Sequence, residues 1–156
     1  MTPSIIIQFE RQLYKYNPEE SVSGTFRVVD AQPDEINRLE FSVLWYTEGK
    51  GDEDLGVHFF LPIHAGNGFE TVSSDSCDHS VVGEKSAPCV KRMSESEELT
   101  FFFCVPLPAS PLSYYGKIVK IHWCVRVRLF LKNGRETKSE RIFTIGKIPP
   151  IQVKLN

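Results

Sequence analysis

Four basic side chains recur along one alternating segment and form the strongest candidate for a binding site. Residues 119–131 alternate between apolar and polar side chains. The polar positions carry a basic row, which we define as Lys120, His122, Arg126 and Arg128. If the segment is a strand, this row lies on one face of a sheet, where it could bind an anionic peptide or a phosphate. Composition alone favours the alternative, in which the same side chains form an ordinary solvated face neutralised by Glu136, Glu140 and their neighbours.

The histidines and cysteines lack the spacing of a metal site. The histidines are scattered at His58, His64, His79 and His122, and the cysteines at Cys77, Cys89, Cys104 and Cys124 include no C-x-x-C pair. Structural zinc sites normally show tight paired spacings, so we expect no metal and no cofactor. Cys104 and Cys124 lie in apolar runs, where a free thiol packs as a small hydrophobe. Whether Cys77 and Cys89 form a disulfide is left open.

Motifs of enzymatic chemistry are missing as well. The chain has no G-x-S-x-G elbow, Walker loop, G-x-G-x-x-G turn, H-E-x-x-H pair or EF-hand spacing. The acidic run at residues 52–54 falls at the tip of an expected hairpin, where charged residues are normally solvated. We therefore expect a protein that is not an enzyme.

Composition restricts the class of partner. The 156 residues carry 18 Lys and Arg against 20 Asp and Glu, which gives a net charge of −2 and no basic field for nucleic acid. No apolar run approaches the ~18 residues of a membrane span. The first residues show no basic region or cleavage site, so we expect no secretory signal and a cytoplasmic protein. The length fits one domain, residues 1–156.

The elements that must position the basic row are strands. Apolar residues alternate with period two in most runs, and no long window keeps a helical period. The predicted strands cover residues 4–9, 22–29, 39–45, 55–61, 99–105 and 119–131, with further shorter ones. Eight or nine strands joined by short turns predict an all-β fold, an immunoglobulin-like β-sandwich of two antiparallel sheets. The serine-rich stretch at about residues 66–98 predicts a long surface insertion, with a short strand near residues 80–82.

Asn133-Gly134 predicts a hairpin, and its loop length decides the pairing. A two-residue loop would set Arg126 opposite Arg141 and Val127 opposite Glu140, which are both unfavourable pairs. A three-residue loop at residues 133–135 avoids both, and we predict this register. Its pairs are Trp123–Ile145, Val125–Phe143, Arg128–Glu140 and Lys132–Glu136.

Three segments together resemble the arrestin-like family. Tyr14–Val28 contains a tyrosine, a proline turn and a V-x-G-x-F strand start, which is similar to the opening of that family. Ile36–Trp45 resembles the family's next alternating strand. Phe103–Leu129 is the most specific match, because a turn rich in proline, serine and tyrosine runs directly into a long strand. The resemblance covers about 130 residues, and bacterial sporulation-control and coat-complex relatives fit it equally.

The resemblance implies the amino-terminal sandwich of a two-domain arrangement in proteins that are generally adaptors. This chain departs from the pattern in three ways. It holds one sandwich, so it is a single-domain relative or lacks its partner half. Near residues 12–15 only Lys15 is basic, so the paired lysines that sense phosphate are missing. Residues 149–152 are not the PPxY motif that recruits ubiquitin ligases.

Two classes of function follow. The first, which we favour, is a non-enzymatic intracellular adaptor that binds an unidentified protein at a strand edge or a sheet face. The alternative is a sandwich that binds a small ligand or a carbohydrate, with Tyr114, Tyr115 and Phe130 as a stacking platform. A homo-oligomer formed through the basic row is compatible with either class.

Overall fold

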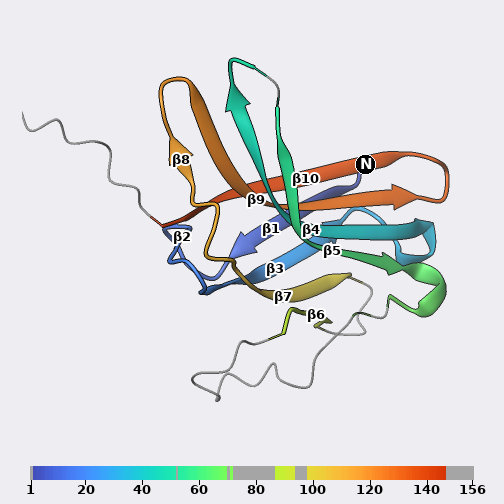
Figure 1. Cartoon of the computed structure of the whole chain (residues 1–156). Coiled ribbons are helices and arrows are strands. Elements are labelled where there is room, and N and C mark those ends of the chain that lie inside the picture. The colour runs from blue at the N-terminus through green and yellow to red at the C-terminus, as the bar shows by residue number, and fades with distance from the viewer. Residues whose placement is uncertain (1, 52, 70, 72–86, 94–97, 147–156) are drawn as a thin grey trace, which may run out of the picture.

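The computed structural model describes residues 2–51, 53–69, 71, 87–93 and 98–146 as two packed β-sheets (Figure 1). The smaller sheet has the strand order β1 (Ser4–Phe9), β3 (Ser21–Val29), β7 (Thr100–Pro106) and β6 (Cys89–Arg92). The larger sheet has the order β2 (Lys15–Tyr16), β10 (Glu136–Ile145), β9 (Val119–Leu131), β4 (Ile36–Gly49) and β5 (Leu55–His64), and β8 (Tyr114–Tyr115) also pairs with β9. The predicted sandwich is confirmed.

Helical structure in the described residues is limited to the short 3-10 segments η1 (Pro33–Glu35) and η2 (Ala65–Asn67). None of the helices there is long or apolar enough to span a membrane. The sheets are antiparallel except for one short parallel pairing, in which β2 lies beside the end of β10. The prediction of purely antiparallel sheets missed this pairing because two residues are too few to show a period.

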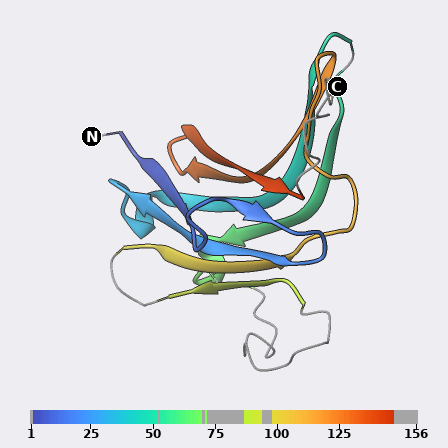
Figure 2. The ribbon, with the colours of Figure 1, turned by 90° about the vertical axis from the view of Figure 1, so that its left-hand side faces the viewer.

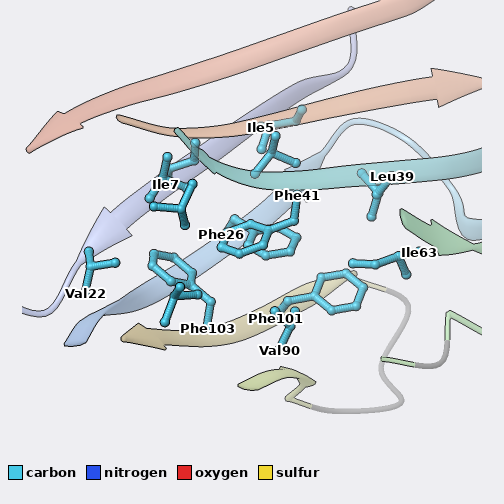
Figure 3. Packing of buried hydrophobic residues seen from close by; sticks show 14 of the residues in the cluster. Ile5, Ile7, Val22, Phe26, Leu39, Phe41, Ile63, Val90, Phe101 and Phe103 are labelled. Carbon is cyan, nitrogen blue, oxygen red and sulfur yellow. The ribbon is translucent and has the colours of Figure 1, made fainter. Parts of the chain in front are cut away.

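The core lies between the sheets and is built from aromatic rings (Figure 3). Phe26 of β3 stacks on Phe101 of β7 and on Phe41 of β4, with ring centroids 4.9 and 5.3 Å apart. All three side chains are fully buried. Rings contributed by both sheets therefore fix how the two layers pack.

The β9–β10 hairpin has the predicted faces but different partners. Its loop is residues 132–134, because Leu131 N–H donates to Arg135 O at 2.9 Å and Gly134 N–H to Leu131 O at 3.1 Å. Gly134 has φ 90°, so it occupies the third loop position, where this hairpin type needs a left-handed residue. Pairs consequently shift by two residues from the prediction, and the observed ones include Trp123–Phe143, Arg126–Glu140 and Arg128–Lys138.

The predicted insertion at residues 66–98 is only partly a surface segment. Residues 89–92 form β6, which pairs with β7, and Cys89 and Val90 are buried, as is Phe69. The prediction failed here because a four-residue strand between polar stretches gives too short a pattern. Cys89 is disulfide-bonded, whereas Cys104 and Cys124 are free thiols. The predicted strand at residues 80–82 and Cys77 lie outside the described residues.

Candidate interaction surface

The basic row lies on the outer face of the larger sheet, away from the core. β9 sits between β10 and β4, and its odd-numbered residues 123–131 are buried, four of them completely. The even-numbered residues of β9 point the other way, so the strand itself brings Lys120, His122, Arg126 and Arg128 to one face. The four do not form one free cationic surface, however, because three of them have partners.

His122 is buried in a small aromatic pocket. Its exposed fraction is 8%, and its Nε2 lies 2.8 Å from Glu48 Oε2. The rings of Tyr46 and Tyr115 pack against the imidazole at centroid distances of 5.1 and 5.6 Å. Its Nδ1 is buried without a hydrogen-bond partner. Side chains of β4 and β8 thus cover His122, which is not part of a solvated face.

The two arginines of the basic row are neutralised by carboxylates on neighbouring strands. Arg126 Nε donates to Glu140 Oε1 on β10 at 2.7 Å. Arg128 Nε donates to Glu136 Oε1 at 2.9 Å, and its guanidinium also faces Glu40 of β4 at 3.7 Å. For the two arginines, the structure therefore shows the predicted alternative in which Glu136 and Glu140 neutralise the row.

Lys120 differs from the rest of the row. It is exposed and has no hydrogen bond or ion pair within the described part of the chain. Glu48 stands opposite it across β4 and β9, but the Glu48 carboxylate is engaged with His122. Lys120 is consequently the member of the row whose side-chain charge is unpaired within the described residues.

An apolar row crosses the same face between these polar groups. Strand pairing sets Val57 of β5 beside Leu44 of β4, Leu44 beside Cys124 of β9, and Cys124 beside Ile142 of β10. We call these four residues the cross-strand row. Leu44 and Cys124 are buried yet lie outside the main core cluster, whereas Val57 and Ile142 are 53% and 46% exposed. The row is thus filled at its centre and open to solvent at both ends.

The larger sheet is curved where Leu44 and Cys124 are buried (Figure 2). In Figure 2, β4, β5 and β9 turn sharply upward in their course, so the larger sheet extends beyond the smaller one. Burial raises the pKa of the Cys124 thiol to about 12, with the nearby Glu140 carboxylate adding to the shift. Burial likewise raises the pKa of Tyr46. Burial therefore keeps the Cys124 thiol and the Tyr46 hydroxyl protonated beyond their usual pH range.

The cross-strand row was missed in the sequence, although β4 carried a signal for it. Val43, Leu44 and Trp45 are three consecutive apolar residues, which indicates a strand covered on both faces rather than on one. Cys124 gives the same indication on β9. The alternation of polar residues around both positions concealed the signal.

The aromatic residues proposed as a ligand platform do not gather at one place. Tyr115 pairs with Lys120 at the start of β9, and Phe130 is ten residues further along that strand, roughly 30 Å at the usual rise per residue. The guanidiniums of Arg38 and Arg128 cover the Phe130 ring at 3.9 and 5.0 Å. Tyr114 is 36% exposed beside Tyr115. A three-ring stacking platform is therefore not assembled.

Groups that could hold a metal are not assembled in the described residues either, where no three His, Cys, Asp or Glu side chains come together suitably. Of the two histidines on β5, His58 places its Nε2 2.7 Å from Pro106 O.

Comparison with known proteins shows the fold. No protein-family model and no curated protein matches the chain. Among solved structures the chain is similar to the sporulation control protein Spo0M from Bacillus subtilis, with a TM-score of 0.57 and 14% sequence identity. The match covers 93% of this chain and 49% of that chain, so this chain spans about half of Spo0M. The fold is an arrestin-like β-sandwich, as the resemblance predicted.

Proposed function

We propose that this chain is a non-enzymatic protein-interaction module of the adaptor type, which acts in the cytoplasm and binds a partner protein through the outer face of its larger sheet. The observation that carries the proposal is the cross-strand row, whose buried apolar centre is flanked by two exposed apolar ends on the outer face of the larger sheet. Apolar surface rimmed by polar groups is typical of protein interaction sites.

The surroundings of the row suit it to binding. On one side lie the paired groups Arg126 and Glu140, and on the other the pair His122 and Glu48. Because Arg126 and Glu140 neutralise each other, a partner can cover this pair without leaving an uncompensated buried charge. Tyr115, 57% exposed, adds an aromatic anchor next to His122. The expected partner surface is therefore apolar, with an acidic group placed for Lys120.

The proposal is tested by site-specific photocrosslinking in a lysate of the source cells. A photoreactive phenylalanine analogue replaces Ile142 at the exposed end of the row, and in a matched control it replaces Ile6. Ile6 is 36% exposed and alternates with the buried Ile5 and Ile7 of β1, so it points outward from the smaller sheet. We expect one discrete protein adduct from position 142 and none from position 6.

A second variant tests the chemistry of the contact. Ile142→Glu places a charge at the exposed end of the row and is expected to weaken capture of that protein at least tenfold, whereas Ile6→Glu leaves it unchanged. Equal adducts at both positions, or no adduct at position 142, would contradict the assignment of this face.

A further inference from the structure

β5 is an edge strand that is both long and apolar. It has ten residues and, within the described part of the chain, pairs only with β4 (Figure 1). Three of its large side chains are about half exposed: Leu55 at 54%, Val57 at 53% and Phe60 at 51%. Natural sheets usually blunt such edges because unpaired backbone groups and apolar side chains together attract another strand.

The backbone of these same residues points away from β4. Thr47 N–H donates to Asp54 O at 2.9 Å, so these two residues form a hydrogen-bonded pair. In an antiparallel ladder such pairs alternate with non-bonded pairs. The next non-bonded pairs toward the middle of β5 are therefore Tyr46–Leu55 and Leu44–Val57. Leu55 and Val57 consequently turn their N–H and C=O groups to the free edge.

A β-bulge halfway along β5 changes which residues turn their backbone groups toward the free edge. The register shifts between Val43 and Leu44 of β4, and His58 is the β5 residue left without a partner. Beyond the bulge, the His64 carbonyl points away from β4, because it accepts the N–H of Phe69 at 3.1 Å. Because the backbone direction alternates from residue to residue along the strand, Pro62 and Phe60 face the free edge as His64 does. The outward residues are thus Leu55, Val57, Phe60, Pro62 and His64.

We propose that a second copy of this chain pairs with β5 through its own β5, antiparallel and about a two-fold axis between residues 58 and 59. A strand that pairs with its own copy must match outward residues with outward residues. This register alone matches all of the first four. Val57 meets Phe60 of the second copy in two central pairs, which can each exchange two hydrogen bonds. Leu55 meets Pro62, which has no N–H, so that pair is limited to one bond, from Leu55 N–H to Pro62 O. The extra residue at the bulge would shift the pairing with a regular strand. In the proposed dimer it does not, because the bulges of the two copies lie opposite each other at the two-fold axis.

Side chains agree with this register. Val57 and Phe60 lie on the outer face, since their β4 partners Leu44 and Ser42 lie there, and an antiparallel pair keeps both side chains on one face. Each Val57 would pack against a Phe60 and shield side chains now half exposed. At the ends, the register brings the exposed carboxylate of Glu53 beside His64 of the second copy, whose imidazole N–H can donate a hydrogen bond to it.

The test is the molar mass in solution, measured by sedimentation over a concentration series. The wild-type chain of 17.8 kDa is expected to reach about twice that mass in the micromolar range, as suits a small edge contact. Val57→Pro removes the N–H that Val57 donates to Phe60 of the second copy, so both central pairs lose one of their two hydrogen bonds, while every β4–β5 hydrogen bond is spared. We expect it to raise the dimer dissociation constant at least tenfold, and Phe60→Lys to do the same.

The controls separate the edge from general stickiness and from misfolding. Val57→Thr keeps the branched shape and the N–H, and Ile118→Lys removes an apolar side chain that is 74% exposed in the loop between β8 and β9. Both are expected to dimerise like the wild type, and all variants must retain the wild-type circular dichroism. A wild-type monomer throughout, or a dimer that Val57→Pro leaves intact, would overturn the proposal.

Discussion

Replacing Gly24 with alanine is expected to destabilise the fold by about 2 kcal/mol. Gly24 lies in β3, between Phe9 of β1 and Phe103 of β7, and it is the glycine of the V-x-G-x-F segment. An alanine Cβ built there would lie 2.0 Å from the backbone oxygen of Gln8 and 3.0 Å from the Gln8 carbonyl carbon. Only glycine fits here, because the backbone of β1 at Gln8 occupies the space that a Cβ atom would need.

The magnitude follows from what must move. A Cβ needs at least about 1 Å more clearance, and the obstacle is backbone, so β1 must shift as a unit. β1 carries the buried side chains Ile5 and Ile7. Overpacking of this kind costs up to about 3 kcal/mol. Alanine recovers up to about 1 kcal/mol by restricting the unfolded chain, which leaves a net loss of about 2 kcal/mol.

Urea unfolding followed by tryptophan fluorescence measures this loss, since Trp123 is fully buried. With a slope of about 2 kcal/mol per molar, the midpoint should fall by about 1 M. Gly66→Ala is the matched control, because nothing lies within 4 Å of its Cβ, and its midpoint should stay within about 0.3 M of the wild type. Equal midpoints for the two variants would refute the claim that β1 occupies this space.

Three further predictions concern the core, the outer face and the hairpin. Phe26→Ala removes the ring stacked on Phe101 and Phe41 and should cost about 3–5 kcal/mol in urea unfolding, whereas a loss below 1 kcal/mol would mean that the rings do not pack there. Because burial raises the pKa of Cys124 from 9.0 to about 12, the unfolded chain loses this proton first as pH rises, so stability should fall above pH 9 by about 1.4 kcal/mol per unit. Comparing urea midpoints at pH 8 and pH 10 tests this, and Cys124→Ala should reduce the decline; an unchanged decline would contradict the assignment. Gly134→Ala places a side chain at φ 90° and should cost about 1 kcal/mol or more, measured by the thermal midpoint, and no change there would argue against the observed loop.

Local patterns along the chain were enough to predict the class of fold and the faces of its strands. A period of two is a local property of the chain, so the alternation of Val119–Leu131 was enough to separate core residues such as Val125 from outer residues such as Arg126. The glycine of Asn133-Gly134 fixed a hairpin in the same local way. The register of the hairpin did not follow from this pattern, because the position of Gly134 in the loop depends on which residue starts the turn. The predicted pairing was therefore shifted by two residues from the observed one.

Which strands are neighbours, and therefore which residues form the candidate surface, depends on the three-dimensional packing of the chain. The carboxylates that neutralise Arg126 and Arg128 stand on β10 and β4, and Glu48, which holds His122, is 74 residues away along the chain. The cross-strand row exists because four strands bring Val57, Leu44, Cys124 and Ile142 into one line. Periodicity states which side of a strand is apolar, but contacts between strands depend on the packing of the whole sheet, which no local pattern records.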